Sequence, residues 1–372
     1  MIKNIQLKNF KCFEEISIPL SNLTLMTGLN GMGKSSVIQA LLVIRQSFQQ
    51  DLLQVGSLAL NGDLINLGTA QAVLYEDAIR DQLEIDLITD SGVRINIGFV
   101  YDIRSDILQQ SIHNYVDSQK TNIFLESLFT DHFQYLQAER IGPRVTFPVS
   151  ENYVYQHRQL GKHGEFTSHF LEIFGRNHKI ISTLKHPKEP ADELIYQTTA
   201  WLGEISPGVA IHLTKHANMD VMNLEYSFLT SIGRSNHYRS SSVGFGITYT
   251  LPVIVAILAA PPGSMLILEN PEAHLHPMGQ VCLGELIALA AAAGVQIILE
   301  THSDHILNGI RVTVRQGKCS PEKVAIHFFS KIEINGRTQS RIESPQMDKD
   351  GRIDQWPDGF FDVWEKSLEK LL

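Results

Sequence analysis

Residues 28–36 read Gly28-Leu29-Asn30-Gly31-Met32-Gly33-Lys34-Ser35-Ser36. This stretch fits the pattern G-x-x-x-x-G-K-[ST] at every fixed position, which is typical of a loop that binds nucleotide phosphates. A short apolar run at residues 23–26 precedes it and predicts a strand, and apolar residues at helical spacing follow it from Val37 to Phe48. Glycines let backbone N–H groups turn toward phosphate oxygens, and the start of the helix adds the positive end of its dipole. The sequence therefore predicts a P-loop nucleotide site in an α/β fold.

The motif also assigns roles to single residues. Lys34 is expected to reach the β- and γ-phosphates, and the Ser35 hydroxyl is expected to hold Mg²⁺. A glycine-rich turn with a chance lysine is the alternative, but the flanking strand and helix disfavour it. ATP and Mg²⁺ are thus the expected cofactors, and the predicted binding residues are Gly28, Asn30, Gly31, Gly33, Lys34, Ser35 and Ser36.

Two further apolar strands end in polar residues. Residues 265–268 are apolar and lead to Glu269, and residues 295–299 lead to the run Glu300-Thr301-His302-Ser303. Ligands of open α/β sheets bind at the carboxyl ends of the strands, so we expect these polar ends to meet at one nucleotide. Glu269 is the predicted carboxylate that completes the Mg²⁺ shell begun by Ser35.

A third polar segment precedes the Glu269 strand. Residues 240–246 are rich in serine and glycine and are followed by an apolar stretch that reaches Ala260. Such a loop at the start of a helix can bind phosphate through its backbone N–H groups, although an ordinary surface loop is the alternative. The candidate binding residues in this loop are Ser242, Gly244 and Gly246.

Composition narrows the class of protein. The 372 residues are 43% hydrophobic and 19% charged, with three cysteines and a net charge of −9. The longest apolar run, residues 251–260, is about half of what a bilayer span requires, and the N-terminus lacks the pattern of a secretion signal. We therefore expect a cytoplasmic protein without a membrane segment, and the negative charge disfavours a general electrostatic grip on nucleic acid.

Four segments together resemble one family. These are the opening residues 5–13 (IQLKNFKCF), the block 269–277 (ENPEAHLHP), Thr301-His302-Ser303, and the loop 242–246. They are similar to the start, the Walker B and D-loop, the switch-histidine loop and a divergent signature loop of ABC-type ATPases in the SMC, RecF and OLD (overcoming-lysogenization-defect) branch. The chain most resembles bacterial AAA ATPases of this length from anti-phage defence islands, over nearly its whole length.

The resemblance implies an α/β ABC-type head with a mixed sheet and antiparallel strands in its first lobe. It also implies a composite site, in which the signature loop of one protomer closes over a nucleotide held by the P-loop of another. ATP would then join a homodimer. By the same resemblance Gln137 is a candidate Q-loop residue, and Lys11 and Phe13 are candidates to flank the adenine base.

One departure from the family pattern affects catalysis. ABC ATPases place the glutamate that activates the attacking water directly after the metal-binding acid, whereas this chain has Asn270 there. An amide cannot accept the proton, so Glu272 is the predicted substitute base, with His302 orienting the water or sensing the γ-phosphate. We therefore expect slow hydrolysis, as in a switch.

The predicted organisation is a first ATPase lobe at residues 1–145, a compact helical insertion at 146–235, and a second lobe with a C-terminal tail at 236–372. SMC relatives insert a coiled coil in the middle segment, but no sustained heptads occur here. About 70 residues follow the switch histidine, so an intrinsic nuclease domain of the kind found in some OLD proteins is not expected.

These observations predict an ATPase that dimerises on nucleotide and controls a separately encoded effector, such as a nuclease, in anti-phage defence. A RecF-like ATPase acting directly on DNA and a scaffold that binds ATP without hydrolysis are the alternatives. A basic stretch between Arg311 and Lys323 is the candidate DNA contact, although a solvated helix face explains it as well. The histidines around residues 274–276 and 302–305 allow a metal site, which the nucleotide role makes unnecessary.

Overall fold

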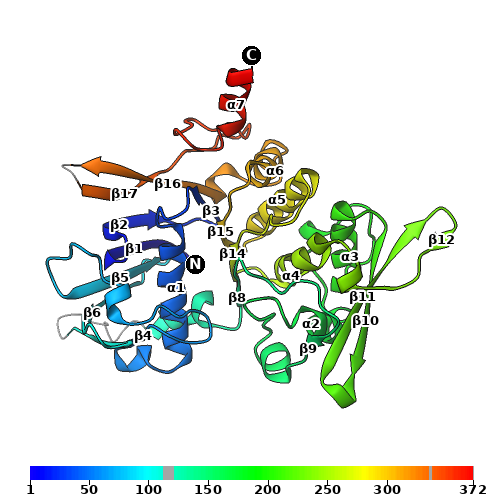
Figure 1. The fold of residues 1–372 in the computed structure, drawn as a ribbon, viewed down its shortest axis with the longest axis horizontal. Helices are drawn as coiled ribbons and strands as arrows, with labels where there is room; N and C mark the ends of the chain where they lie inside the picture. The colour runs from blue at the N-terminus through cyan, green and yellow to red at the C-terminus, as the bar shows by residue number, and fades with distance from the viewer. Residues whose placement is uncertain (112–120, 335–336, 372) are drawn as a thin grey trace. The chain divides into compact units, whose positions relative to one another are not determined.

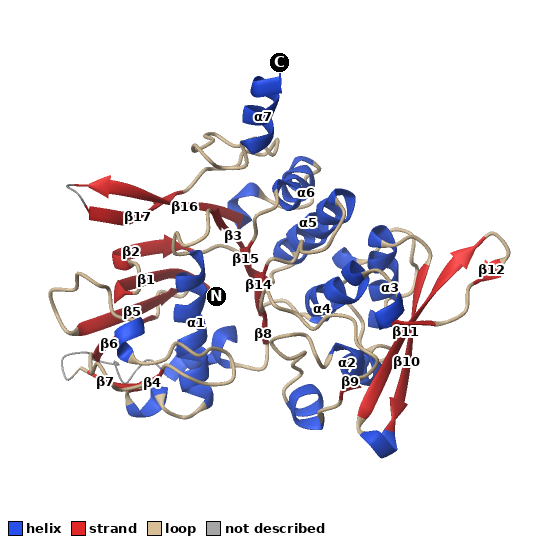
Figure 2. Ribbon diagram, in the orientation of Figure 1, coloured by secondary structure: helices blue, strands red, loops and turns tan. Residues whose placement is uncertain are grey.

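The computed structural model describes residues 1–111, 121–334 and 337–371. The chain forms two compact units. The first comprises Met1–Thr130, Val324–Gln346 and Ile353–Leu372, and the second comprises Asp131–Lys323 and Met347–Arg352. Figure 1 follows the chain by colour, and Figure 2 shows that each unit contains both helices and strands.

The first unit contains an antiparallel sheet in the order β2-β1-β5-β6-β7-β4. Neighbouring strands pair antiparallel throughout, which confirms the antiparallel strands expected of the first lobe. The register Ile85↔Ile97 belongs to the hairpin of β5 and β6, whose residues alternate in polarity as a half-buried hairpin requires. The strands are β1 Ile2–Phe10, β2 Phe13–Pro19, β4 Ser57–Ala59, β5 Gln82–Thr89, β6 Arg94–Val100 and β7 Ile107–Gln110.

The P-loop strand lies in a second, mixed sheet of the first unit. Strand β3 (Leu23–Gly28) is buried along its whole length and pairs parallel with β16 (Val324–Ile334), which pairs antiparallel with β17 (Arg337–Glu343). Helix α1 (Lys34–Gln49) follows β3 after the loop and buries Val37, Leu41 and Ile44. The remaining elements are the 3-10 turns Leu53–Val55, Ala70–Ala72, Thr121–Leu125 and Ser127–Phe129, and the C-terminal helix α7 (Val363–Leu371).

The second unit is built on three parallel strands in the order β15-β14-β8. They are β8 (Phe133–Leu136), β14 (Met265–Glu269) and β15 (Gln296–Glu300), and their apolar runs are those of strands covered on both faces. Helices α4 (Phe245–Ala259), α5 (Pro277–Ala292) and α6 (Asp304–Arg315) accompany them.

Helices α5 and α6 cross very closely. A Cβ on Gly284 would lie 2.3 Å from the Ile306 carbonyl oxygen, and one on Gly309 would lie 2.2 Å from that of Val281. Only glycine therefore permits this crossing.

Residues 146–235 contain helices, as predicted, but also strands that the prediction of a helical insertion omits. Helices α2 (Thr167–Phe174) and α3 (Leu194–Ile205) are followed by a long hairpin of β10 (Val209–His216) and β11 (Val221–Thr230). Along β11, Met222, Leu224 and Tyr226 are buried and alternate with less buried residues, the period of a half-buried strand. The shorter elements here are the π-helical turn Asn152–Gln156, the 3-10 turns Ser182–Leu184 and Ala217–Met219, and strands β9 Phe147–Pro148, β12 Gly233–Arg234 and β13 Tyr238–Arg239.

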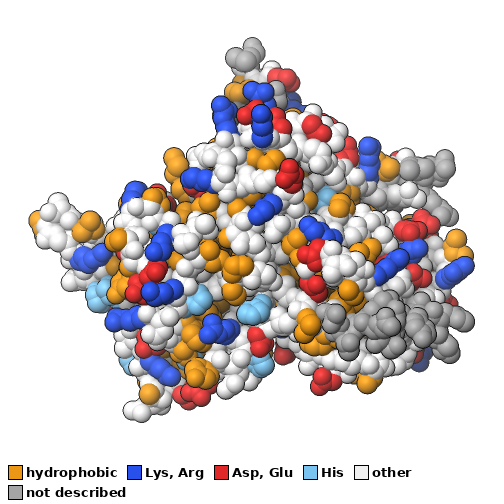
Figure 3. Space-filling model, turned by 180° about the vertical axis from the view of Figure 1, so that it is seen from behind, with side chains coloured by type: hydrophobic (Ala, Val, Ile, Leu, Met, Phe, Trp, Pro, Cys, Tyr) orange, Lys and Arg blue, Asp and Glu red, His pale blue; other side chains and the backbone are white. Residues whose placement is uncertain are grey.

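The C-terminal segment from Val324 groups with the first unit rather than with the second lobe. The reason is strand pairing, because β16 hydrogen-bonds to β3 in a register that matches Phe329 with Gly28. Within the described part of the chain, none of the helices combines the length and apolar character that crossing a membrane requires. On the face in Figure 3, cationic and anionic side chains are intermixed.

Candidate functional site

The first group of predicted site residues is the P-loop between β3 and α1, in the first unit. Gly28 has φ 133° and Gly33 has φ 112°, conformations that side chains with a Cβ rarely adopt. A Cβ on Gly28 would lie 2.2 Å from the Phe329 carbonyl oxygen, and a Cβ on Gly33 would lie 2.6 Å from the Phe13 ring. Both glycines are thus required by the backbone and by their neighbours, so the loop geometry follows from the motif itself.

Lys34 lies inside the loop. Its side chain is only 3% exposed, and its Nζ donates to the carbonyl oxygens of Gly28 at 2.8 Å and Leu29 at 3.0 Å. No side chain among the described residues caps the start of α1, where Gly33 is the N-cap. Backbone donors, the helix dipole and a lysine ammonium therefore converge here, and this set fits a nucleotide phosphate chain.

The other predicted residues of the loop line its outer side. Asn30, Gly31 and Ser35 are exposed, and Ser36 is half-buried with its N–H donating to Gly33 at 3.0 Å. An exposed hydroxyl at the first turn of the helix is the type of ligand that Mg²⁺ accepts beside a phosphate. The exposed position of Ser35 at this turn is compatible with its predicted role in holding Mg²⁺.

A cavity of about 530 Å³ lies next to the P-loop in the first unit, lined in part by Cys12, Phe13, Tyr75 and Arg80. The Phe13 ring is 2% exposed and packs against Gly33, and Lys11 donates through Nζ to Gln39 on α1. Of the two predicted adenine neighbours, only Phe13 belongs to the cavity lining.

A second group of predicted site residues lies in the second unit, at the carboxyl end of β14. The Glu269 carboxylate accepts a hydrogen bond from the Tyr135 hydroxyl at 3.0 Å and another from the Ala138 N–H at 3.1 Å. Burial raises the pKa of Glu269, whereas these two donors and the Arg140 charge lower it. Each carboxylate oxygen keeps a second lone pair, so the orientation fits the predicted role in holding Mg²⁺.

Arg140 organises this edge of the sheet, and the sequence analysis missed it. The guanidinium donates to the carbonyl oxygens of Glu269 and Asn270 at 2.7 Å each, of Gln137 at 3.1 Å, and of Tyr249 at 3.2 Å. It is 4% exposed, lies 4.4 Å from the centre of the Tyr249 ring, and burial lowers its pKa to about 10. The polar run after β8 was the available signal, but nothing in it distinguished Arg140 from its neighbours.

Glu272 and His302 lie side by side across two loops. The His302 N–H donates to Glu272 Oε1 at 2.9 Å, and Glu272 Oε2 is buried with no hydrogen-bond partner among the described residues. Their loops leave the neighbouring parallel strands β14 and β15, which confirms that these two polar strand ends meet. The His302 side chain itself is exposed.

Asn270 stands in the position that the family gives to the catalytic base. It has φ 43°, a left-handed conformation that asparagine tolerates better than glutamate does. Its N–H donates to the Glu300 carbonyl oxygen at 2.8 Å, which ties the two loops together. The backbone at this position therefore gives a physical reason for asparagine.

The signature-like loop leads into α4 in the same unit. Gly244 is the N-cap of α4 and is exposed, and a Cβ built on it finds no described atom within 4 Å. Ser242 is also exposed. Gly246 lies so close to the Glu269–Pro277 block that its Cβ would be 2.5 Å from the His274 carbonyl oxygen. This loop is thus anchored at Gly246 and open at Ser242 and Gly244.

The remaining candidates have partners inside the second unit. Gln137 donates through Nε2 to the Glu139 carbonyl oxygen at 3.0 Å and lies 2.8 Å from His163 Nδ1. His276 caps α5 by accepting from the Met278 N–H. Within the described ranges, no group of three or more His, Cys, Asp or Glu side chains is placed to hold a metal ion by itself.

The predicted basic stretch is largely engaged within its own unit. Arg311 donates to the Gly351 carbonyl oxygen at 2.7 Å, Lys323 donates to that of Ala292 at 2.7 Å, and Lys318 pairs with Glu285 at 3.1 Å. These contacts favour the solvated helix face over a dedicated DNA contact.

Comparison with known proteins places the chain in a family. A model described as "AAA domain, putative AbiEii toxin, Type IV TA system" matches residues 23–308, and a model described as a protein of unknown function matches residues 319–371. An OLD nuclease from Thermus scotoductus (strain ATCC 700910 / SA-01) is 24% identical over 328 residues. The match covers 82% of this chain but 59% of that protein, so the chain spans well under two thirds of its relative.

Solved SMC head domains share the fold. A head bound to the C-terminal winged-helix domain of ScpA aligns with TM-score 0.54 and 15% identity, covering 92% of this chain and 98% of that chain. The head of Pyrococcus yayanosii Smc aligns with TM-score 0.52 and 11% identity, covering 99% of each chain. These alignments confirm the ABC-type head with a mixed sheet. The chain therefore belongs to the family of AAA domains described as putative AbiEii toxins of type IV toxin–antitoxin systems, and it is a P-loop ATPase with an SMC-head-like fold.

Proposed function

We propose that this ATPase is a slow nucleotide-dependent switch. Two copies would clamp ATP between the P-loop of one and the signature-like loop of the other, and hydrolysis would release them. Lys34 would bind the β- and γ-phosphates, Ser35 and Glu269 would hold Mg²⁺, and the ion would neutralise charge on the phosphates. The clamped dimer acts on a separate effector protein, a nuclease, in defence against phage.

The observation that carries the proposal is that two groups in the second unit, a carboxylate oxygen and a helix start, lack hydrogen-bond partners among the described side chains. Among the described residues, one buried carboxylate oxygen of Glu272 has no partner, and no side chain caps the open helix start at Gly244. A buried polar atom without a partner is costly in a protein that has no use for it. The attacking water would be the missing partner of Glu272, and a nucleotide held by a second copy would supply phosphate oxygens for the start of α4.

In this proposal, proton transfer during hydrolysis depends on Glu272 and His302. Glu272 takes the proton of the attacking water through Oε2, while the His302 N–H holds the other carboxylate oxygen in place. Glu272 stands two residues beyond the usual position of the base, and Asn270 cannot accept a proton. The proposal therefore includes a slow rate.

The role in defence rests on the relatives. The family description names toxin–antitoxin systems, and one relative is an OLD nuclease of which this chain spans 59%. We propose that the effector activity lies in a partner protein, and that the purified chain does not cut DNA. Incubation with supercoiled and linear DNA, Mg²⁺ and ATP tests this point, because cleavage that disappears in a Glu269→Ala variant would assign the nuclease to this chain.

Mixing two inactive variants tests the clamp. Lys34→Ala disables the P-loop half of a site. Gly244→Glu disables the signature half, because a carboxylate there repels the γ-phosphate. Gly244 has φ −56°, ψ 134° and free space at its Cβ, so glutamate fits the isolated protomer. Random exchange makes about half of the dimers mixed, each with one intact site of two, which predicts about a quarter of the wild-type ATPase rate.

The control is Gly203→Glu, which adds the same side chain to an open position on α3 and should leave the rate unchanged. No recovery in the mixture, after subunit exchange has been demonstrated, would contradict independent composite sites built on residues 242–246. A protein that stays monomeric in saturating ATP would refute the clamp.

A further inference from the structure

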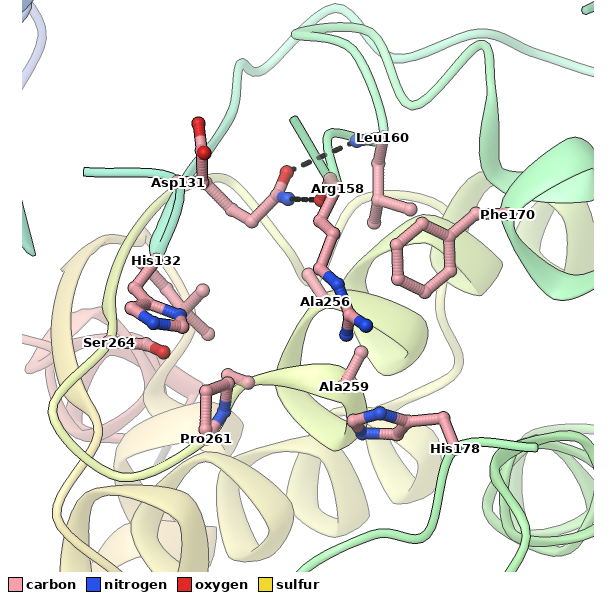
Figure 4. A pocket seen from close by; sticks show the side chains of 13 residues that line it. Asp131, His132, Arg158, Leu160, Phe170, His178, Ala256, Ala259, Pro261 and Ser264 are labelled. Atoms are coloured by element: carbon pink, nitrogen blue, oxygen red, sulfur yellow. Dashed lines mark hydrogen bonds between the residues drawn. The ribbon is translucent and has the colours of Figure 1, made fainter. Parts of the chain in front are cut away.

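A second cavity lies in the second unit, away from the nucleotide edge. It has a volume of about 200 Å³ and lies where β8 and β14 begin and α4 ends (Figure 4). Two predicted nucleotide residues of this unit lie at the opposite ends of these elements, since Glu269 ends β14 and Gly244 precedes α4. Its lining residues are Asp131, His132, Gln134, Arg158, Leu160, Phe170, His178, Ala256, Ala259, Ala260, Pro261, Ser264 and Leu266.

Most of the wall is apolar, and its apolar residues include buried ones. Leu160, Phe170, Ala256 and Leu266 are each less than 5% exposed, and they come from separate segments of the core. A wall of this kind favours an apolar body over a hydrated ion, because it offers contact area without hydrogen bonds.

One cation faces this apolar space. The Arg158 guanidinium points into the cavity in Figure 4 and is steadied by the Phe174 ring, whose centre is 4.7 Å from Cζ. Arg158 forms no ion pair with a described residue. The planar fork of an arginine matches a carboxylate with two parallel hydrogen bonds.

Ser264 gives an independent sign of a ligand. The residue is 2% exposed, and its Oγ has no hydrogen-bond partner among the described residues. Figure 4 shows this oxygen directed into the same space as the Arg158 guanidinium. A buried hydroxyl without a partner is expected where a bound molecule supplies one.

The single arginine on the cavity wall favours a ligand with one negative charge over a ligand with two. Burial and the nearby Arg158 charge both lower the pKa of His178, so this imidazole is neutral near pH 7. Asp131 also lines the cavity, and its carboxylate lies 3.2 Å from Nδ1 of His157, a residue that is not part of the lining. Arg158 is thus the one fixed positive charge on the described wall, which suits a single carboxylate better than a phosphate dianion.

We propose that this cavity binds a small amphiphilic monocarboxylate. The carboxylate pairs with the Arg158 guanidinium, the apolar or aromatic body packs against Leu160 and Phe170, and the Ser264 hydroxyl hydrogen-bonds to the carboxylate. The site is independent of the nucleotide site, so the Lys34→Ala protein should bind the same molecule equally well.

Calorimetry with phenylacetate and its uncharged isostere phenylacetamide tests the proposal on the wild-type full chain. Phenylacetate should bind with a Kd of about 1 mM or tighter, and phenylacetamide at least about tenfold more weakly. Equal binding of the two would overturn the carboxylate assignment. Absence of phenylacetate binding, or binding of inorganic phosphate with equal affinity, would overturn the site.

Two variants locate the bound molecule. Arg158→Gln should weaken phenylacetate binding about tenfold or more, whereas Arg176→Gln, at an exposed position outside the lining, should not. Ser264→Ala should weaken binding without lowering the Tm, because it removes a hydroxyl that has no partner in the described protein. Unchanged binding in both lining variants would place the molecule elsewhere and refute the proposal.

Discussion

Glu272→Gln removes the proposed base while keeping the shape of the side chain. The amide oxygen can still accept the hydrogen bond that the His302 N–H donates to Glu272 Oε1 at 2.9 Å. The amide nitrogen takes the place of Oε2, which has no partner among the described residues, so one unsatisfied atom replaces another. We therefore expect the free energy of unfolding to change by no more than about 1 kcal/mol.

The effect on hydrolysis should be far larger than the effect on folding. Loss of a general base costs about 10²–10⁴-fold in rate, which corresponds to about 2.7–5.4 kcal/mol of activation free energy. ATP binding should persist because the P-loop is unaltered, and the protein should accumulate as an ATP-bound dimer. Single-turnover experiments measure the hydrolysis rate, calorimetry measures the affinity for ATP, and light scattering in the presence of ATP measures the mass of the dimer.

Two comparisons separate catalysis from structure. Glu285→Gln changes a carboxylate of the same unit whose ion pair with Lys318 is partly exposed, so it should alter neither rate nor stability by a large amount. Glu272→Ala also removes the acceptor of the His302 N–H, so it should lose stability in addition to activity. If Glu272→Gln and the wild-type protein hydrolyse ATP at the same rate, Glu272 is not the base. A measurable shared rate would point to His302, whereas a background rate in both proteins would point to a protein that does not hydrolyse ATP.

Three further substitutions test the P-loop and the carboxyl end of β14. Lys34→Ala should weaken ATP binding by several kcal/mol, on the order of a buried charged hydrogen bond or two, and unchanged affinity in calorimetry would rule out the P-loop assignment. Arg140→Lys should lower the free energy of unfolding by about 3 kcal/mol or more in denaturant titrations, because an ammonium cannot replace the four hydrogen bonds of the guanidinium. Unchanged stability would show that these hydrogen bonds are dispensable. Asn270→Glu should cost about 1 kcal/mol in the same titrations because of φ 43°, and it should raise the turnover of the Glu272→Gln protein if that loop presents its side chain to the water; a rate that stays at the Glu272→Gln level would show that it does not.

The P-loop could be predicted from sequence because its determinants are local. Gly28, Gly33 and Lys34 lie within seven consecutive residues, and their conformations follow from the backbone freedom of glycine and from the strand and helix on either side. The strands that end at Glu269 and Glu300 could also be predicted from sequence, because an apolar run followed by an acid is recognised without any distant partner.

Contacts between distant residues were decided by the tertiary structure. Arg140 reaches the carbonyl oxygens of Glu269 and Asn270 about 130 positions away, and Tyr135 reaches Glu269 over a similar separation. No spacing rule links such positions, because the register of β8 on β14 places them together. The left-handed backbone of Asn270 likewise depends on the Glu300 loop beside it.

Sequence alone thus determined the class of fold, the nucleotide loop and the chemical types at the strand ends. The tertiary structure decided which oxygen of Glu272 has no partner in the described part of the chain, where the strand from Val324 pairs, and that Arg158 and Ser264 face one cavity. The physical reason is that local motifs carry their own conformational preferences, whereas burial and hydrogen-bond satisfaction are set by neighbours that the chain brings together only on folding.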